Sequence, residues 1–247
     1  MKTVKGVFVT GTDTGVGKTL VSSALIRRLA QIGRSVGVMK PVETGVEPAV
    51  ADHSDAARLM AAAGIDDALE VISPYRFSAP LAPLAAASAQ GQVIEFEAIM
   101  RCYAQLAARY SCVVVEGAGG LLVPMGKDWD MGDLICRLEL PVVLVGRAGL
   151  GGINHALLTL EALERRQIPV LALVLNETAP SSNSIQEEQR ASTIALLQER
   201  VAVPVLGPIP YQSGLDCAWH DKVEQLAGSH PIRELAGSVW KAVAGTS

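Results

Sequence analysis

The chain has 247 residues, of which 49% are hydrophobic and 19% charged, so it contains enough apolar material for a sizeable core. Its 21 basic and 25 acidic residues give a formal net charge of −4, which argues against a general nucleic-acid binder, since such a protein needs a basic surface. No run approaches the roughly 18 uninterrupted apolar residues of a membrane span. We therefore expect a single domain over residues 1–247, with neither a nucleic-acid nor a membrane partner.

Cysteine and histidine are too scattered to indicate a metal site of the zinc type. The four cysteines form no CxxC pair and the four histidines form no HExxH motif. The sequence runs directly into a predicted strand rather than a secretory signal. We therefore expect reduced cysteines and a cytoplasmic protein.

A glycine-rich motif follows the predicted strand at residues 6–10. It reads Gly-Thr-Asp-Thr-Gly-Val-Gly-Lys-Thr over residues 11–19 and opens an amphipathic helical pattern. This combination is typical of a phosphate-binding loop, in which backbone N–H groups and the helix N-terminus bind phosphate oxygens. Lys18 is predicted to reach the β- and γ-phosphates, and the Thr19 hydroxyl to bind Mg²⁺.

The motif departs from the usual phosphate-loop pattern at one position. That pattern has glycine five residues before Gly17, where this chain has Thr12, and the glycine lies one residue earlier at Gly11. The alternative interpretation is an ordinary turn before a helix. The Lys-Thr pair after the last glycine favours the phosphate loop, because a plain turn does not need it.

A second strand is predicted at residues 34–39, and Lys40 follows it. The carboxyl end of a strand in an open α/β sheet is where ligands bind, although a solvated lysine there is also common. Further on, Ser54 is a plausible helix N-cap, and Asp55 in the first turn suits the helix dipole. An acidic group near Mg²⁺ is the alternative role for Asp55.

The most apolar strand pattern is Cys112–Val115, which is typical of a parallel strand buried on both faces. It ends in Glu116 and a predicted turn at Gly117–Gly120, whose glycines allow close approach to a ligand. In phosphoryl-transfer sites an acidic residue at such a strand end holds Mg²⁺. A proline-rich loop upstream, at residues 78–83, either lines a pocket for an aliphatic chain or covers the core.

Asn176 is predicted to end a later strand, where its amide suits an adenine edge, although asparagine is also an ordinary turn residue. Asn154 is the expected cap of a helix that ends at residue 166. A polar loop is expected at residues 181–184, and the end of the chain is expected to be mostly helical. Further strands are predicted at residues 141–146, 169–175 and 204–207, and further helices at residues 95–109 and from 185 to about 200.

Strands that alternate with helices predict a doubly wound, mostly parallel α/β sheet with right-handed crossovers. Lys18, Lys40, Glu116 and Asn176 all fall at or just past the carboxyl ends of predicted strands, which form the ligand-binding edge of such a sheet. Their agreement is a stronger indication of a nucleotide site than any one of them.

The motifs together resemble those of the dethiobiotin synthase family, which has a P-loop NTPase-like fold. The resemblance lies in Gly11–Thr19, in Lys-Pro-Val-x-Thr-Gly at Lys40–Gly45 and in Val115–Gly120, and it extends to Gly151–His155 and Gly207–Pro210. It covers nearly the whole chain in the expected order. The displaced first glycine of the phosphate loop is part of that family's pattern.

The resemblance implies a concrete reaction, the penultimate step of biotin biosynthesis. The family converts 7,8-diaminononanoate (diaminopelargonate), CO₂ and ATP-Mg²⁺ into dethiobiotin, ADP and phosphate. One amine takes up CO₂ as a carbamate, and the carbamate oxygen attacks the γ-phosphate to give a carbamic–phosphoric anhydride. The second amine then closes the ring and expels phosphate.

The resemblance also implies roles for individual residues. Lys40 matches the catalytic lysine, and Lys18 is its expected helper in stabilising negative charge. The Mg²⁺ ligands are expected to be Thr19, Asp55 and Glu116. The residues that match the ATP site are Gly15, Val16, Gly17, Lys18, Thr19, Leu20, Asp55, Glu116, Gly117, Ala118, Gly119, Asn176, Glu177, Pro208, Ile209 and Pro210.

The family is a homodimer, and part of its substrate site comes from a neighbouring subunit. Residues that match this site are Thr14 and Thr44 for the carbamate and diamine end, and Gly151, Gly152, Ile153 and Asn154 for the substrate's carboxylate tail across the interface. Some members carry an acidic residue at the position of Gly15, a charge that this chain lacks.

Three other classes explain less of the sequence. ATPase switches of the partition or cell-division type carry a signature lysine where this chain has Asp13, which has the opposite charge. Cobyrinate amide synthases share the Glu-Gly-Ala-Gly turn, but they need a glutamine-hydrolysing domain for which the chain has neither the length nor a convincing Cys–His site. A plain nucleotide-binding module leaves Lys40 and the Glu116 turn unexplained.

Overall fold

The computed structural model describes residues 4–46, 53–180 and 183–245. Its main sheet is built from the strands β1 (Gly6–Gly11), β2 (Val36–Met39), β5 (Cys112–Gly120), β6 (Val142–Arg147), β7 (Val170–Asn176) and β8 (Val205–Ile209). The strand order is β2-β5-β1-β6-β7-β8, and every neighbouring pair is parallel. The predicted doubly wound, parallel α/β fold is confirmed.

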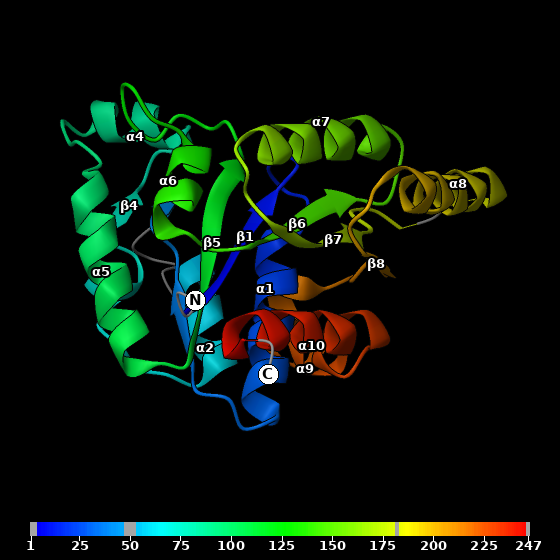
Figure 1. The fold of residues 1–247 in the computed structure, drawn as a ribbon, viewed down its shortest axis with the longest axis horizontal. Coiled ribbons are helices and arrows are strands. Elements are labelled where there is room, and N and C mark those ends of the chain that lie inside the picture. Colours follow the sequence, from blue (N-terminus) through cyan, green and yellow to red (C-terminus); the bar gives the residue numbers. More distant parts are fainter. Residues whose placement is uncertain (1–3, 47–52, 181–182, 246–247) are drawn as a thin grey trace.

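Helices cover both faces of this sheet, with α6 and α7 on one side and α1, α9 and α10 on the other (Figure 1). The helices are α1 (Lys18–Gln31), α2 (Asp55–Ala63), α3 (Leu69–Ile72), α4 (Pro83–Ala89), α5 (Phe96–Arg109), α6 (Met131–Leu138), α7 (Gly152–Arg165), α8 (Ser184–Arg200), α9 (Leu215–Ala227) and α10 (His230–Ala244). Within the described part of the chain, no helix is both long enough and apolar enough to cross a membrane.

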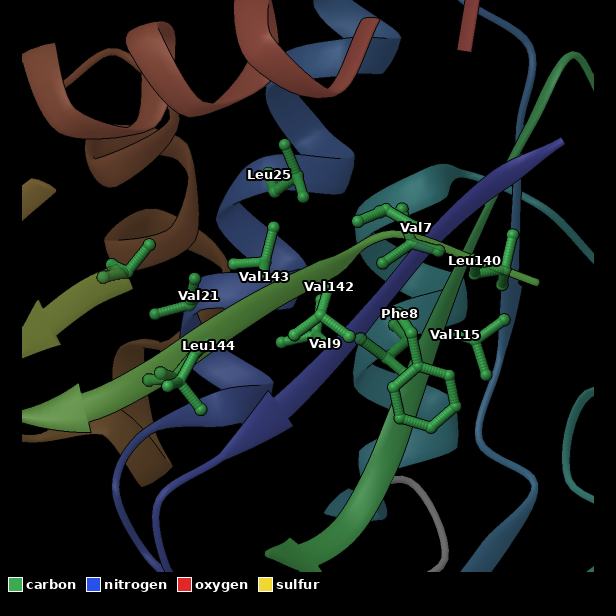
Figure 2. Packing of buried hydrophobic residues seen from close by; sticks show 14 of the residues in the cluster. Val7, Phe8, Val9, Val21, Leu25, Val115, Leu140, Val142, Val143 and Leu144 are labelled. Carbon is green, nitrogen blue, oxygen red and sulfur yellow. The ribbon is translucent and has the colours of Figure 1, made fainter. Parts of the chain in front are cut away.

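The core lies between the central strands and the helices that cover them. The valines of β5 and β6 are completely buried, because a parallel strand covered on both faces needs apolar side chains pointing both ways. Figure 2 shows Val21 and Leu25 of α1 among the valines of β1 and β6. Each buried side chain of this size contributes about 1.5–3 kcal/mol, so this packing holds the phosphate loop, which joins β1 to α1, on a rigid base.

Two predicted boundaries were wrong because strand pairing and close backbone approach override local turn signals. The expected turn at Gly117–Gly120 is the continuation of β5, in which Gly120 pairs with Gly11 of β1. Asn154 is not a cap: Gly151, at φ +82°, precedes α7, which begins at Gly152. A Cβ at Gly152 would lie 2.2 Å from the carbonyl oxygen of Arg147, so only glycine fits at this position.

Other boundaries shift by a few residues. Strand β8 continues through Pro208 and Ile209, which the sequence places after it. The apolar loop at residues 78–83 gives way to α4, which starts at Pro83, a favoured residue in a first helical turn. The expected loop at 181–184 lies partly outside the described residues, and α8 already begins at its last residue. Two short strands that the sequence did not indicate, β3 (Val42–Thr44) and β4 (Tyr75–Phe77), pair in a small parallel sheet.

Candidate nucleotide and metal site

The phosphate loop joins β1 to α1 and depends on two glycines in the left-handed region. Gly15 has φ +73° and Gly17, directly before α1, has φ +98°. A Cβ at Gly17 would lie 2.2 Å from the amide nitrogen of Asn176, whereas a Cβ at Gly15 would meet nothing within 4 Å. Gly17 is therefore required both by its backbone angle and by lack of space, and Gly15 by its angle alone.

Lys18 lies along this loop and is almost completely buried. Its Nζ donates to the backbone carbonyl of Asp13 at 3.0 Å. Burial and the nearby charge of Lys40 lower the pKa of Lys18 to about 8. The Asp13 carboxylate in turn pairs with Arg147 at 2.9 Å and accepts from the backbone N–H of Thr14 at 2.7 Å. These contacts fix Lys18 beside the loop, where its ammonium group can bind an anion.

A buried lysine–carboxylate cluster lies beside the loop. The Nζ of Lys40, just past β2, is 2.6 Å from Glu116 Oε1 and 2.7 Å from Asp55 Oδ2. The Thr19 hydroxyl lies 2.8 Å from Asp55 Oδ1 and 2.9 Å from Glu116 Oε1. Although burial opposes the charged form, the two carboxylates raise the pKa of Lys40 above its ordinary value. Although burial opposes the ionised carboxylate, Lys40 lowers the pKa of Asp55.

Glu43 positions the helix that carries Asp55. Its carboxylate accepts the backbone N–H of Asp55 at 2.5 Å and that of Ala56 at 3.3 Å. Burial and the charge of Asp55 raise the pKa of Glu43. The predicted cap is also present, because the Ser54 hydroxyl accepts the N–H of Ala57 at 3.1 Å. Asp55 therefore lies in a capped first turn and in the cluster at once, so its two predicted roles are compatible.

The oxygens of this cluster suit Mg²⁺. Thr19, Asp55 and Glu116 supply a hydroxyl and two carboxylates, which are the hard donors that Mg²⁺ prefers. Oε2 of Glu116 is buried and has no hydrogen-bond partner among the described residues, so it still lacks a positive partner. The described part of the chain has no group of three or more His, Cys, Asp or Glu side chains placed to hold a metal. An ion here would accordingly need phosphate or water oxygens as further ligands.

A cavity of about 410 Å³ opens over the loop and the cluster. The predicted site residues that line it are Thr14, Gly15, Gly17, Lys18, Thr19, Leu20, Lys40, Thr44, Asp55, Ala118, Gly119, Asn176 and Glu177. Val16, Glu116 and Gly117 lie buried behind this wall. The structure does not place Pro208–Pro210 or Gly151–Asn154 on the cavity.

Asn176 ends β7, Glu177 follows it, and both line the cavity. Three strands of the sheet separate β7 from β2, which Lys40 follows. The Asn176 amide nitrogen donates to the carbonyl of Val16 at 3.0 Å, while its Oδ1 is buried without a partner among the described residues. That oxygen remains available to accept an N–H from a base. The Glu177 carboxylate forms an ion pair with Arg190 at 2.7 Å and accepts the backbone N–H of Tyr211 at 3.2 Å. The second contact holds the segment after β8 in place.

The sequence analysis missed part of the cavity wall. Glu43 and Arg58 are close in sequence to predicted residues, and that proximity is the only signal that would have found them. No pattern marks Trp219 on α9, which reaches the cavity through tertiary packing. The missed lining residues are Val42, Glu43, Arg58, Thr178, Tyr211, Gln212, Leu215 and Trp219.

A second cavity of about 380 Å³ lies on the other side of Thr14, between the phosphate loop, the end of β5 and α7. Leu122 and Leu158 line it and are themselves 62% and 57% exposed. Thr14 borders both cavities, so the two lie next to each other at the phosphate loop.

A parallel sheet that presents a phosphate loop, a buried lysine and two carboxylates at one edge defines a P-loop nucleotide-binding protein. The chain matches the AAA domain family over residues 5–218. Solved structures with the same fold include MinD of Aquifex aeolicus in its complex with MinC, at 14% identity and a TM-score of 0.55 over 99% of this chain and 98% of that one. Cobyrinic acid a,c-diamide synthase from Mycobacterium smegmatis is similar at 15% identity and TM-score 0.55, over 99% and 97% of the two chains.

Sequence relatives are much closer than these structures. The ATP-dependent dethiobiotin synthetase BioD of Anaeromyxobacter dehalogenans strain 2CP-C is 47% identical over 82% of this chain and 90% of its own length. The ATP-dependent dethiobiotin synthetase BioD of Thermodesulfovibrio yellowstonii is 40% identical over 90% of this chain and 94% of its own length. The chain belongs to the ATP-dependent dethiobiotin synthetase family, which confirms the resemblance seen in its motifs.

Proposed function

We propose that this chain closes the ureido ring of dethiobiotin from 7,8-diaminononanoate and CO₂, using ATP and Mg²⁺. The observation that carries the proposal is the position of Lys40, bound between Asp55 and Glu116 beside the phosphate loop. A plain nucleotide-binding module has no use for a buried lysine there. A carboxylation that passes through an acyl phosphate needs such a lysine, because negative charge collects on the carbamate and phosphoryl oxygens.

The reaction proceeds in three steps. A substrate amine adds to CO₂ and loses a proton, which gives a carbamate. A carbamate oxygen forms a bond to the γ-phosphorus of ATP as the bond to the bridging oxygen breaks, and ADP leaves. The second amine attacks the carbonyl carbon of the resulting anhydride, loses a proton and expels inorganic phosphate, which closes the five-membered urea.

Lys18 and Lys40 stabilise the charge that develops in these steps. Both are preorganised by contacts to Asp13, Glu116 and Asp55, so little rearrangement is needed when the charge forms. Thr19, Asp55 and Glu116 would hold Mg²⁺, which supplies charge neutralisation on the phosphates when bound. The free Oδ1 of Asn176 accepts from the adenine amino group.

The diamine and its chain occupy the side of Thr14 that faces the second cavity, where leucines suit an aliphatic chain. Thr14 and Thr44 hold the carbamate and diamine end. Gly151, Gly152, Ile153 and Asn154 lie at the start of α7. The Gly152 N–H donates to the Gly149 carbonyl, and the N–H groups of Ile153 and Asn154 in the first turn suit a carboxylate. Because these residues are outside the main cavity, we propose that they serve the site of a partner copy in a homodimer.

The first test is phosphate release from ATP-Mg²⁺ and bicarbonate, with and without the diamine, while the product mass is followed. Diamine-dependent release together with a dethiobiotin mass is the expected result. Release that ignores the diamine would instead indicate an ATPase switch. No release despite bound ATP would indicate another substrate on the same scaffold.

The role of Lys40 is tested by Lys40→Ala. We expect turnover to be nearly abolished while ATP still binds, because the lysine acts on the reacting oxygens rather than on the base. The change also leaves the buried Glu116 carboxylate and the half-buried Asp55 carboxylate without Lys40 between them, so added Mg²⁺ should raise the melting temperature of Lys40→Ala more than that of the wild type. Turnover like that of the wild type would overturn this role.

The homodimer is tested by Leu158→Asp. Leu158 of α7 is 57% exposed beside the second cavity, and Leu150, before α7, is 81% exposed. A carboxylate in an apolar interface is unfavourable, so the variant should be monomeric in light scattering while still binding ATP. Val93→Asp, at an apolar residue that is 76% exposed before α5, is the matched control and should leave the dimer intact.

A further inference from the structure

Arg58 and Trp219 form part of the cavity wall that neither the phosphate loop nor the lysine–carboxylate cluster accounts for. Arg58 lies one turn after Asp55 on α2, and Trp219 lies on α9, which packs on α1. The Arg58 guanidinium carbon is 4.1 Å from the centroid of the Trp219 ring. Both side chains line the same cavity as Lys18 and Thr19.

The guanidinium has unused hydrogen-bonding capacity. Its only polar partner among the described residues is Asp216, at 3.5 Å and with a 92% exposed side chain, a pair of the kind that contributes little. Stacking on an indole occupies the face of the guanidinium and leaves the N–H donors at its edge free. The Arg58 side chain is 20% exposed, so these donors are partly shielded from water at the cavity.

We propose that Arg58 is a further nucleotide-binding residue, oriented by Trp219, whose N–H groups donate to the phosphate chain of the bound nucleotide. The inference rests on the proposed ATP site. Phosphate is the expected partner because it matches a guanidinium in charge and in geometry. The carboxylates at the cavity have other partners. Asp55 and Glu116 pair with Lys40, Glu43 accepts backbone N–H groups of α2, and Glu177 pairs with Arg190, so Arg58 keeps only its long contact to Asp216 among the described residues.

The competing explanation is that Arg58 only ties α9 to α2. The chain offers a matched control for this, because Arg27 of α1 pairs with Glu224 of α9 at 2.5 Å and is absent from the cavity wall. Removal of either arginine takes away a contact of α9 and should loosen that helix. Only removal of Arg58 should change nucleotide binding.

The experiment compares wild type, Arg58→Met, Arg58→Lys and Arg27→Met. Calorimetry measures the affinity for ATP-Mg²⁺ and ADP, NMR titration measures that for adenosine, and thermal unfolding reports stability. We expect Arg58→Met to bind both nucleotides about tenfold more weakly with adenosine unchanged, since a charge-assisted hydrogen bond to phosphate is lost. Arg58→Lys should recover part of the loss, and Arg27→Met should lower stability without changing affinity.

The outcomes separate this inference from the proposed function. Equal nucleotide affinity in wild type and Arg58→Met would overturn the phosphate contact, as would an equal loss for adenosine or an equal loss in Arg27→Met. Failure of the wild type to bind any adenine nucleotide would instead overturn the proposed function. Phosphate release that does not depend on the diamine would count against the proposed reaction but would leave the Arg58 result standing.

Trp219 provides an independent readout. Trp219→Leu removes the aromatic face that orients Arg58 and should weaken ATP-Mg²⁺ binding about threefold, with Trp219→Phe losing less because a ring remains. ATP-Mg²⁺ should also change the tryptophan fluorescence of the wild type, and most of that change should disappear in Trp219→Phe. A fluorescence change that persists undiminished in Trp219→Phe would contradict an arrangement in which Trp219 faces the nucleotide.

Discussion

At Gly17 the phosphate loop passes so close to β7 that no side chain fits between them. A Cβ there would lie 2.2 Å from the Asn176 amide nitrogen, which is hydrogen-bonded to the loop through Val16. The loop and Asn176 are therefore one packed unit. A change at Gly17 should disturb the phosphate loop and the position of Asn176 together.

Gly17→Ala is expected to weaken ATP-Mg²⁺ binding by more than tenfold, because the loop and Asn176 must move apart and the left-handed backbone angle is strained. Gly15→Ala shares the positive φ but meets no neighbour, so it should cost only the strain of that angle, about 1–2 kcal/mol in urea unfolding. Calorimetry and urea titration of both variants make the comparison. Similar affinities in the two would show that the approach of Asn176 does not matter.

At the scale of elements, α6 and α7 are joined by a charged corner. Asp130 caps α6 through a reciprocal pair with Asp133, at 3.0 and 2.8 Å, and Arg166 at the end of α7 contacts both Asp130 oxygens at 2.7 and 2.6 Å. Burial opposes the ionised form of Asp130, but the hydrogen bonds from Arg166 and from backbone N–H groups outweigh it and lower the pKa of Asp130. This corner sets α7, and with it the Gly151–Asn154 segment, relative to β5.

A carboxyl group whose pKa is lower in the folded state than its ordinary value of 3.8 stabilises the fold fully at pH values above 3.8. That stability is lost as the pH falls through the folded-state pKa. Asp130→Asn keeps a capping oxygen but loses the ion pair with Arg166, so it should lower the free energy of unfolding by about 1 kcal/mol at pH 7 and by less near pH 3. Urea unfolding at the two pH values measures the difference. An equal loss at both would assign the effect to packing rather than to charge.

For the whole molecule, the C-terminal helix α10 is part of the core. It packs on α1, β1, β7 and β8 and buries Ile232, Leu235 and Val239. The match to the AAA domain family ends at residue 218, before this helix. The role of this region is not visible in its motifs, and the structure shows that it closes one face of the sheet.

A chain that ends at Gly228 should lose its cooperative thermal transition, since the face covered by α10 would be exposed to water. A chain that ends at Ala244 keeps the helix and should unfold like the full protein. Calorimetric scans of the two shortened chains measure this difference. A cooperative transition in the shorter chain would contradict the prediction of one domain over residues 1–247.

The sequence by itself determined the architecture and most of the ligand-binding edge, because the signals involved are local. Apolar runs mark buried parallel strands, glycines followed by Lys18 and Thr19 mark a phosphate loop, and Ser54 marks a helix start. Once strands alternate with helices, their carboxyl ends share one edge. Lys40, Glu116 and Asn176 could therefore be assigned to one site from their positions in the chain.

Only the tertiary structure decided which of these groups touch. Thr19 and Glu116 are 97 residues apart and meet because β5 lies between β2 and β1, an order that no local pattern contains. The same order brings Lys40 to Glu116 and lets β5 continue through the glycines expected to form a turn. Arg58 and Trp219 meet only because α2 and α9 both pack on α1. Contacts between distant elements depend on how whole faces pack, so periodicity and turn chemistry do not specify them.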